Sequence, residues 1–408
     1  MAPSLTNLCL RSRPVHIRAI SLLFVSLWVS SIPVACGGGG VACSPASPTA
    51  PTSSGYFPYQ QGWLGADGAY SIPLGAGRSL WLFADTFVGA ASARTRTQAN
   101  GFIHNTIAIS TCSGSNCSFQ YYWPGMGASQ PGPVFAAPGT DWFWPMDGFT
   151  SNGTLYVALM QMHGTGSGGA FGFAYSGAQL ASIANPTAPP SQWVITYQQL
   201  NTGGSAVPGV SIVANQGPGG NPNPLDPQGA RYAYFFTAVG SPPSQALLRI
   251  PLADLNSLAR PGNSDWQYLS ASGAWEPWQS TATALPSDNV VVIKPGATEM
   301  TVRYHAATNQ WIAVYPQGLD NASGYSLSSS LIGGWGAPEQ LYAYPEMQSS
   351  NANYTPHVFC YAAKEHVEFE SAGQLFFTYA CNSTVESDIT QNMNLYHPVV
   401  VTQSLPSN

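Results

Sequence analysis

Charged side chains are the scarcest feature of this 408-residue chain, in which Asp, Glu, Lys and Arg together make up 7% of the residues. Only 12 Lys or Arg stand against 18 Asp or Glu, so the net charge is −6 and no basic stripe is available to bind a polyanion. We therefore expect no nucleic acid partner. A neutral surface rich in Trp and Tyr favours an uncharged polar ligand such as a sugar.

Long helical patterns and the common catalytic and nucleotide-binding motifs are also absent from the sequence. Only "GAQLASIA" (177–184) and "LADLNSLA" (252–259) suggest short helices. There is no P-loop, no G-x-S-x-G elbow and no His-x-x-x-His pair, and the His and Cys spacings do not fit a metal site. No loop has the pattern of a Ca²⁺ site. The sequence therefore predicts no cofactor and no bound metal.

The N-terminus has the pattern of an export signal. Arg11, Arg13 and Arg18 precede an apolar run of 14 residues, which is too short for an ordinary membrane span. The run ends in "PVAC" at Cys36, followed by "GGGG", which is typical of a bacterial lipoprotein signal; a second "VAC" ends at Cys43. We expect a lipoprotein-type signal peptide with the lipid on Cys36, or alternatively on Cys43. An ordinary cleaved signal peptide is the other interpretation.

These features predict three parts of the chain. They are a signal peptide at 1–35, a flexible Gly-, Ser- and Pro-rich tether at 36–55 and a single domain at 56–408. The expected location is the cell envelope, either periplasm or cell surface, or the medium if the chain is not lipidated. We expect a monomer that contacts a membrane only through its lipid anchor.

Export permits disulfide bonds. Cys112 and Cys117 enclose the tight loop "CSGSNC", and Cys360 and Cys381 lie on two successive strand-like segments. The sequence therefore predicts two structural disulfides, Cys112–Cys117 and Cys360–Cys381.

Turn residues and aromatic residues are abundant, with 42 Gly, 34 Pro and 12% Phe, Trp and Tyr. A turn followed by an aromatic-rich strand occurs five times, and the marker aromatics are 65–78 residues apart: Trp81, Tyr156, Tyr234, Trp311 and Phe376. Five units of about this length without a long helix predict an all-β fold, a five-bladed β-propeller of mostly antiparallel four-stranded blades. A pair of β-sandwiches is the alternative, but no linker divides residues 56–402.

The first of these hairpins, "GADGAYSIPLGAGRSLWLFADTF", carries aspartates on its two facing arms. A turn centred on Ala76 sets Asp67 opposite Asp85, with Cβ atoms about 4.5–5.5 Å apart. Two close carboxylates in apolar surroundings raise one pKa, which leaves an acid beside a carboxylate. Glycoside hydrolases use that division of labour. The alternative is that Asp67 forms a turn and Asp85 caps a strand end.

Polar residues occupy corresponding places in the other hairpins. Because the first strands of a propeller surround a channel, residues at the same end of those strands converge on one pocket. We expect substrate binding by His104, Asn105, Trp144, Asp147, Glu299, Arg303, His366 and Asn382. The third hairpin offers only neutral candidates such as Asn215. Taken singly, each of these residues could instead cap a strand end or satisfy a turn, and Arg303 could form a salt bridge.

Several segments together carry a resemblance to a known family: "GADGAYSIPL", "RSLWLFADTFVG", "HNT", "TEMTVRY", "YAAKEHVEF", "LFFTYACNS" and "LYHP". They resemble secreted bacterial five-bladed propellers known as a domain of unknown function, some members of which are endo-D-arabinanases. The resemblance implies that the catalytic pair lies in the "DG" and "W-x-F-x-D-T" motifs, at Asp67 and Asp85. Ala84 and Val367 stand where most members have Gly and Pro, which indicates a different subfamily.

The sequence as a whole therefore predicts a glycoside hydrolase that cleaves a furanoside-type polysaccharide such as arabinan. Asp67 and Asp85 are expected to serve as general acid and as base or nucleophile. The second hypothesis is a non-catalytic, carbohydrate-binding surface lipoprotein, which needs no opposed carboxylates. A structural or adhesion propeller is a third, and it predicts no deep polar pocket.

Overall fold

The computed structural model describes residues 56–113, 116–167, 171–201, 204–214, 231–259, 266–278, 284–318 and 321–406. The expected signal peptide at 1–35, the tether at 36–55, Cys36, Cys43 and Asn215 lie outside the described residues. Within the described part, no helix is both long and apolar enough to cross a membrane.

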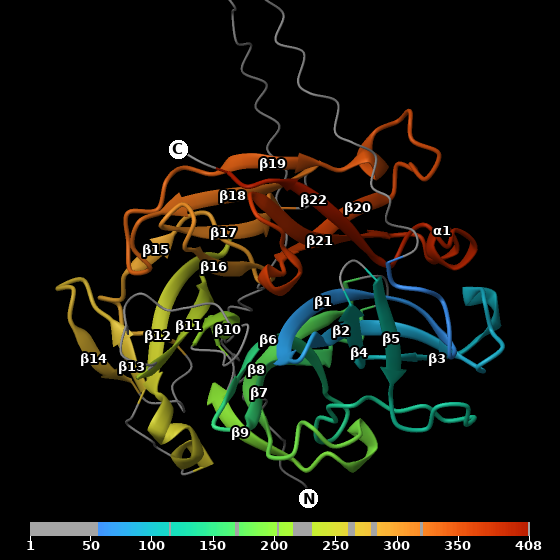
Figure 1. The fold of residues 1–408 in the computed structure, drawn as a ribbon, viewed down its shortest axis with the longest axis horizontal. Coiled ribbons are helices and arrows are strands. Elements are labelled where there is room, and N and C mark those ends of the chain that lie inside the picture. Colours follow the sequence, from blue (N-terminus) through green and yellow to red (C-terminus); the bar gives the residue numbers. More distant parts are fainter. Residues whose placement is uncertain are drawn as a thin grey trace, which may run out of the picture.

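The described strands form five antiparallel sheets that follow one another around a ring (Figure 1). The first sheet contains β1 (Trp63–Gly75), β2 (Arg78–Gly89), β3 (Ala99–Ile103), β4 (Thr106–Ser113) and β5 (Asn116–Tyr122). The second contains β6 (Trp142–Ser151), β7 (Thr154–Gly164), β8 (Phe173–Ile183) and β9 (Ile195–Asn201). The third contains β10 (Ala206–Val213), β11 (Tyr232–Val239), β12 (Ser244–Pro251), β13 (Trp266–Leu269), β14 (Trp275–Trp278) and β15 (Val291–Ile293).

Two further sheets complete the ring. The fourth contains β16 (Thr301–His305), β17 (Gln310–Pro316), β18 (Ala322–Ser328) and β19 (Glu339–Ala343). The fifth contains β20 (Val358–Glu365), β21 (Gln374–Ser383) and β22 (Pro398–Ser404). The first strands contact one another in order, β1 with β6, β6 with β10, β10 with β16, β16 with β20 and β20 with β1. This closed circle of first strands confirms the five-bladed β-propeller.

The five aromatic-rich segments become the second strands of the blades, namely β2, β7, β11, β17 and β21. A second strand has neighbours on both edges and lies between adjacent blades, so both of its faces are buried and its sequence is almost continuously apolar. The marker residues Trp81, Tyr156, Tyr234, Trp311 and Phe376 all belong to the buried core. Burial of these large side chains between blades is the main favourable contribution to folding.

The helices in the described part are short. They are η2 (Arg96–Gln98), η3 (Pro190–Gln192), η4 (Leu252–Ala259), η5 (Pro345–Met347), η6 (Val367–Phe369) and α1 (Glu386–Gln391). The expectation of a helix at 252–259 is confirmed as the 3₁₀-helix η4. The expectation at 177–184 is wrong, because residues 177–183 form the end of β8, which is paired on both sides by β7 and β9. Tertiary pairing here overrides the helix propensity of Ala and Leu.

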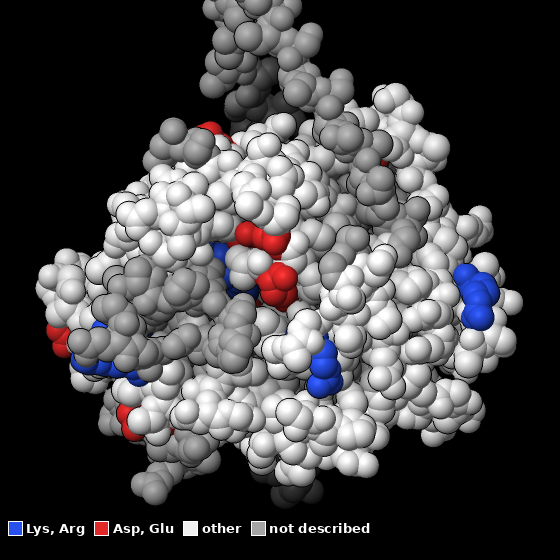
Figure 2. All heavy atoms as spheres, viewed as in Figure 1, with Lys and Arg blue, Asp and Glu red and all other residues white. Residues whose placement is uncertain are grey.

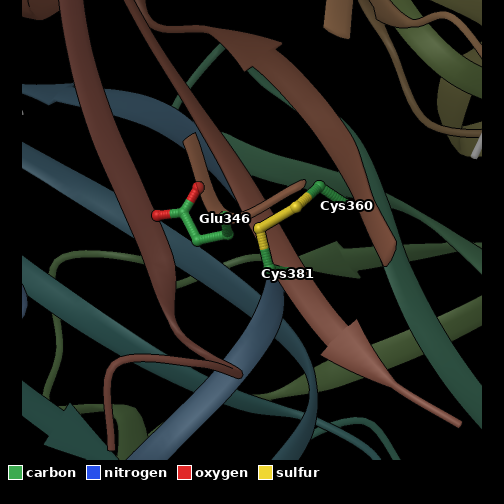
Figure 3. Close-up of side chains that lie close together, drawn as sticks. All are labelled: Glu346, Cys360 and Cys381. Carbon is green, nitrogen blue, oxygen red and sulfur yellow. A yellow bond between two sulfur atoms is a disulfide. The ribbon is translucent and has the colours of Figure 1, made fainter. Parts of the chain in front are cut away.

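Both expected disulfides are present. Cys112–Cys117 closes the β4–β5 hairpin, and Cys360–Cys381 joins directly paired residues of β20 and β21. Figure 3 shows the second disulfide beside the carboxyl group of Glu346. Because both sulfur atoms are bonded to each other, they are not available as metal ligands with Glu346.

Candidate functional site

The β1–β2 hairpin brings the two aspartates together. Ala76 and Gly77 form its turn with φ of 53° and 70°, as a type I′ hairpin requires. Beyond the regular pairs that end at Tyr70 and Leu82, the register shifts between Gly68 and Tyr70 and again between Ala66 and Gly68. Since Ala66 faces Thr86 and Gly68 faces Phe83, Asp67 lies opposite the Ala84–Asp85 step. The predicted turn is therefore present, and a bulge adjusts the facing pair.

Asp67 is half-buried at the channel end of β1. Its Oδ2 accepts hydrogen bonds from the hydroxyls of Tyr361 at 2.5 Å and Tyr396 at 3.4 Å. Its Oδ1 is buried and has no hydrogen-bond partner among the described residues. Burial, then the charges of Asp85 and Glu299, raise the pKa of Asp67 well above its usual range. Asp67 therefore favours the protonated form.

Asp85 lies in a more polar setting on β2. Its Oδ1 accepts a hydrogen bond from the indole N–H of Trp144 at 2.9 Å and lies 2.8 Å from Nδ1 of His104. The Asp85 side chain is 18% exposed and that of His104 is 37% exposed, so both reach the surface of the site. Two ring nitrogens at one oxygen fix the direction of the carboxylate, and its other oxygen accepts no hydrogen bond from the described residues.

A third carboxylate, Glu299, lies just before β16. Its side chain is 27% exposed, and its Oε1 accepts a hydrogen bond from Nζ of Lys364 at 2.8 Å. Lys364 is fully buried and also donates to the carbonyl oxygens of Gly68 and Ala362. Burial lowers the pKa of Lys364, and the charges of Glu299 and Asp67 oppose that effect. The lysine therefore lies beside two carboxyl groups of the site, those of Glu299 and Asp67.

Charged residues make up only 7% of the chain. Figure 2 shows Asp or Glu and Lys or Arg side chains gathered around a hollow near the middle of one face. This grouping agrees with the convergence of polar residues that the propeller predicts for its channel.

Asp147 and Arg303 form a buried ion pair in the channel wall. Arg303 donates from Nη1 to Oδ2 at 2.9 Å and from Nη2 to Oδ1 at 3.0 Å, and Asp147 also accepts from the backbone N–H of Ile212. Their side chains are 0% and 5% exposed, respectively. The sequence predicted substrate binding by both residues. The structure places them beneath the site, where they join the second, third and fourth blades and do not present free polar atoms to a ligand.

Asn105 and His366 are likewise buried. Asn105 donates to the carbonyl oxygens of Phe135 and Phe143, which fixes the chain between the first two blades. His366 has Nδ1 2.7 Å from Ser71 Oγ and Nε2 at Thr378 Oγ1, and burial lowers its pKa well below the usual value. Both side chains have their polar atoms occupied, so they support the site from behind.

The remaining predicted residues lie at the site itself. His104 stacks on Trp142 with ring centres 4.4 Å apart, and Trp144 packs edge-on against Phe173. Asn382, on β21, donates weakly to the hydroxyl of Tyr361 at 3.4 Å. Indole and phenyl rings beside paired carboxyl groups provide apolar faces on which a sugar ring can stack.

Three residues of the site were not predicted from the sequence: Tyr361, Lys364 and Tyr396. Simple alternation along β20 puts Tyr361 and Lys364 on opposite faces. The register shifts between these two residues, and Ala362 has a φ of 60°, so the bulge turns both toward the first blade. The only sequence signal for Tyr361 and Lys364 is that a tyrosine and a lysine occur in a first strand of a chain with few charged residues.

A match to one protein family covers most of the chain. The family is described as "Domain of unknown function (DUF5005)", and it matches residues 52–402. No curated protein matches the chain.

Among solved structures, a protein from Bacteroides ovatus described as a "putative hydrolase" has a TM-score of 0.61 and 16% identity, covering 83% of this chain and 85% of its own. A GH43_1 enzyme from Xanthomonas citri has a TM-score of 0.41 and 13% identity, covering 87% and 91%. A GH43 β-xylosidase/α-arabinofuranosidase from a compost metagenome has a TM-score of 0.42 and 10% identity, covering 88% and 96%. The first likeness establishes a shared fold, and the other two are too distant to establish more.

Proposed function

The chain belongs to the family described as "Domain of unknown function (DUF5005)", and we propose that it is a glycoside hydrolase that cleaves a furanoside-type polysaccharide such as arabinan. In this proposal Asp67 is the general acid and Asp85 is the general base or nucleophile. The observation that carries it is the facing placement of two carboxyl groups in unlike surroundings. Unequal environments are how hydrolases divide acid and base roles between two carboxyl groups.

The acid role of Asp67 is supported by where its proton can reside. Burial and two neighbouring carboxylates raise its pKa well above the usual range. The Tyr361 and Tyr396 hydroxyls occupy Oδ2, so the unpartnered Oδ1 is the oxygen that can carry the proton. On substrate binding, that proton would pass to the glycosidic oxygen as the bond to the anomeric carbon breaks.

The base or nucleophile role of Asp85 is supported by its donors. The Trp144 indole can only donate, so the Asp85 oxygen that it contacts is an acceptor. Trp144 and His104 fix the orientation of the carboxylate, and its second oxygen is free to attack the anomeric carbon or to activate water. Trp142 stacks on the His104 ring, and Phe173 packs edge-on against the Trp144 ring.

The furanoside class rests on the resemblance of the motifs to those of endo-D-arabinanases, and the neutral, aromatic character of the site supports a sugar. The test is a panel of D-arabinan, L-arabinan, galactofuranan and pyranoside polymers, with new reducing ends and polymer binding measured separately. We expect new reducing ends from a furanoside polymer. Binding without cleavage of any polymer would overturn the enzyme proposal in favour of a carbohydrate-binding protein.

We also propose that the chain is exported and lipid-anchored through Cys36. Two disulfides in the described residues support an oxidising compartment. Mass spectrometry of the mature N-terminus tests this proposal. A diacylglycerol-modified Cys36 is expected, whereas modification at Cys43 or an unmodified N-terminus would contradict the assignment.

A further inference from the structure

A second group of ionisable side chains lies at the opposite end of the channel from Asp67. His305 is the last residue of β16, Glu365 is the last residue of β20, and Glu370 follows η6. Asp67 and Glu299 lie near the beginnings of their first strands, whereas these three residues lie where β16 and β20 end and turn back. The group is therefore separate from the proposed catalytic site.

The three side chains converge on one small volume. One ligand atom from each lies within 4.8 Å of the others. The Nε2 of His305 is 2.6 Å from Oε1 of Glu365, and its Nδ1 is 3.6 Å from Oε2 of Glu370. The backbone N–H of Glu365 donates to Oγ1 of Thr301, which holds the end of β20 against β16.

Glu365 lies against the carboxyl group of Glu370, and one of its oxygens receives no hydrogen bond from an N–H or hydroxyl donor in the described residues. The residue is 1% exposed, and its Oε2 is buried without a hydrogen-bond partner among the described residues. A buried carboxylate oxygen without a donor is costly, on the order of a few kcal/mol, unless a proton or a cation satisfies it. This oxygen is the observation that points to a ligand.

Among the described residues, none of the nearby basic side chains donates a hydrogen bond to Oε2 of Glu365. Arg303 is committed to both oxygens of Asp147, and Lys364 donates to Glu299 and two carbonyl oxygens. His366 is occupied by Ser71 and Thr378. The neighbouring Glu368 adds another carboxyl group, whose Oε1 is also buried without a partner in the described part of the chain. Glu368 has Ser71 as a side-chain partner, so two glutamates, Glu365 and Glu370, share one histidine.

A pocket gives access to the group from solvent. It has a volume of about 210 Å³, and His305 and Glu370 are part of its lining, together with the chain that turns between β16 and β17 and between β20 and β21. Glu365 does not line the pocket, but its carboxyl group contacts His305. A small hydrated ion could therefore reach the group by this path.

We propose that His305, Glu365 and Glu370 bind a divalent transition-metal ion, Zn²⁺ or Mn²⁺. One imidazole nitrogen with two carboxylate oxygens is a ligand set that suits these ions, and water from the pocket completes the coordination. The ion supplies the missing partner for Glu365 and joins the fourth blade to the fifth. No spacing motif marks these three ligands in the sequence, because they come from two different hairpins.

The test begins with the full-length protein stripped of metal by EDTA and dialysed into chelator-free buffer. Titration with Zn²⁺ alone, and separately with Mn²⁺ alone, is followed by calorimetry and by the melting temperature. We expect one ion per chain and a rise in melting temperature. The Glu370→Gln variant should weaken binding at least about a hundredfold, because loss of an outer partner alone costs 10–100-fold.

Glu276→Gln is the matched control, since Glu276 is exposed on β14 and far in sequence from the site. It should bind the ion as the wild type does. No binding of either ion by the wild type would overturn the proposal and indicate protons shared among the three side chains. Equal binding by wild type and Glu370→Gln would also overturn it, because the ion would then lie elsewhere. Neither result depends on hydrolase activity, so failure here leaves the proposed function intact.

Discussion

Asp67 and Asp85 have the same chemistry but receive different hydrogen bonds. Two tyrosine hydroxyls contact Asp67, which is close to the charges of Asp85 and Glu299. Asp85 instead receives an indole N–H and faces a half-exposed imidazole. The sequence pattern predicts that the two aspartates face each other. It does not predict their different surroundings, because these depend on Tyr361, Tyr396 and Trp144 from other blades.

Replacing Tyr361 with phenylalanine tests this assignment through the pH profile. The hydrogen bond from Tyr361 lowers the pKa of Asp67, so its removal raises that pKa further. A general acid works only while protonated, and the alkaline limb of kcat/KM should therefore move to higher pH. Tyr354→Phe, at an exposed tyrosine, should leave the limb in place. A limb that stays or moves to lower pH in Tyr361→Phe would contradict the role of Asp67.

At the scale of elements, bulges in the first strands determine the direction in which buried polar side chains point. Register shifts occur in β1 beside Asp67, in β6 beside Asp147, in β10 before Ser211 and in β20 between Tyr361 and Lys364. Such bulges turn side chains that plain alternation would send to the other face.

Some features follow from the local sequence pattern, and others depend on bulges and on contacts between blades. This difference explains which predictions could be made from the sequence. The five aromatic second strands and the Ala76 turn follow from local pattern and could be predicted. The ion pair of Asp147 with Arg303 and the position of Lys364 depend on bulges and on contacts between blades. The alternation of buried and exposed residues along a strand shows neither where a bulge lies nor which residues of two blades meet.

The two disulfides should differ in their contribution to stability. Cys360 and Cys381 are 21 residues apart, and Cys112 and Cys117 are 5 apart. In the chain-entropy account, the longer loop is worth about 3 kcal/mol and the shorter about 2 kcal/mol. Urea unfolding of Cys360→Ala/Cys381→Ala and of Cys112→Ala/Cys117→Ala checks this order. A larger loss from the Cys112–Cys117 pair would show that loop length does not decide the effect.

At the scale of the whole molecule, buried polar contacts hold the blades around the channel. Asp147, Ile212 and Arg303 connect the second, third and fourth blades. Arg96, which is 3% exposed, donates to the carbonyl oxygens of Leu64, Leu395 and Tyr396 and so connects the first blade to the segment before β22. These contacts complement the apolar packing between sheets and close the ring.

Removing one partner of the buried ion pair should be strongly destabilising. Arg303→Met leaves the Asp147 carboxylate without its counter-ion, and such a loss costs about 3–5 kcal/mol. Arg94→Met, at an exposed arginine, is the control and should change stability little. The double variant Asp147→Asn/Arg303→Met should lose less than the sum of the two single losses, measured by chemical denaturation. Strict additivity would show that the two residues do not act as a pair.

Buried histidine should make the fold sensitive to acid. Burial lowers the pKa of His397 to about 4, against 6.5 for an ordinary histidine. The unfolded chain therefore takes up the proton first, and stability present above pH 6.5 is lost as the pH falls toward 4.

His397→Gln should reduce this acid-induced loss by about 3 kcal/mol between pH 7 and pH 4, as measured by urea unfolding at both values. His357→Gln, at an exposed histidine, should retain the full loss. An unchanged loss in His397→Gln would mean that His397 is not held neutral in the folded state.

The most direct test of the central claim uses Asp67→Asn and Asp85→Asn on two substrates. One is the polymer found in the glycan panel, and the other is an aryl glycoside of the same sugar, whose leaving group needs no proton. Asp67→Asn should lose cleavage of the polymer by at least about a hundredfold and keep most activity on the aryl glycoside, because only the acid is missing. Asp85→Asn should lose both activities. Undiminished polymer cleavage by either variant would contradict the claim that these two aspartates perform the reaction.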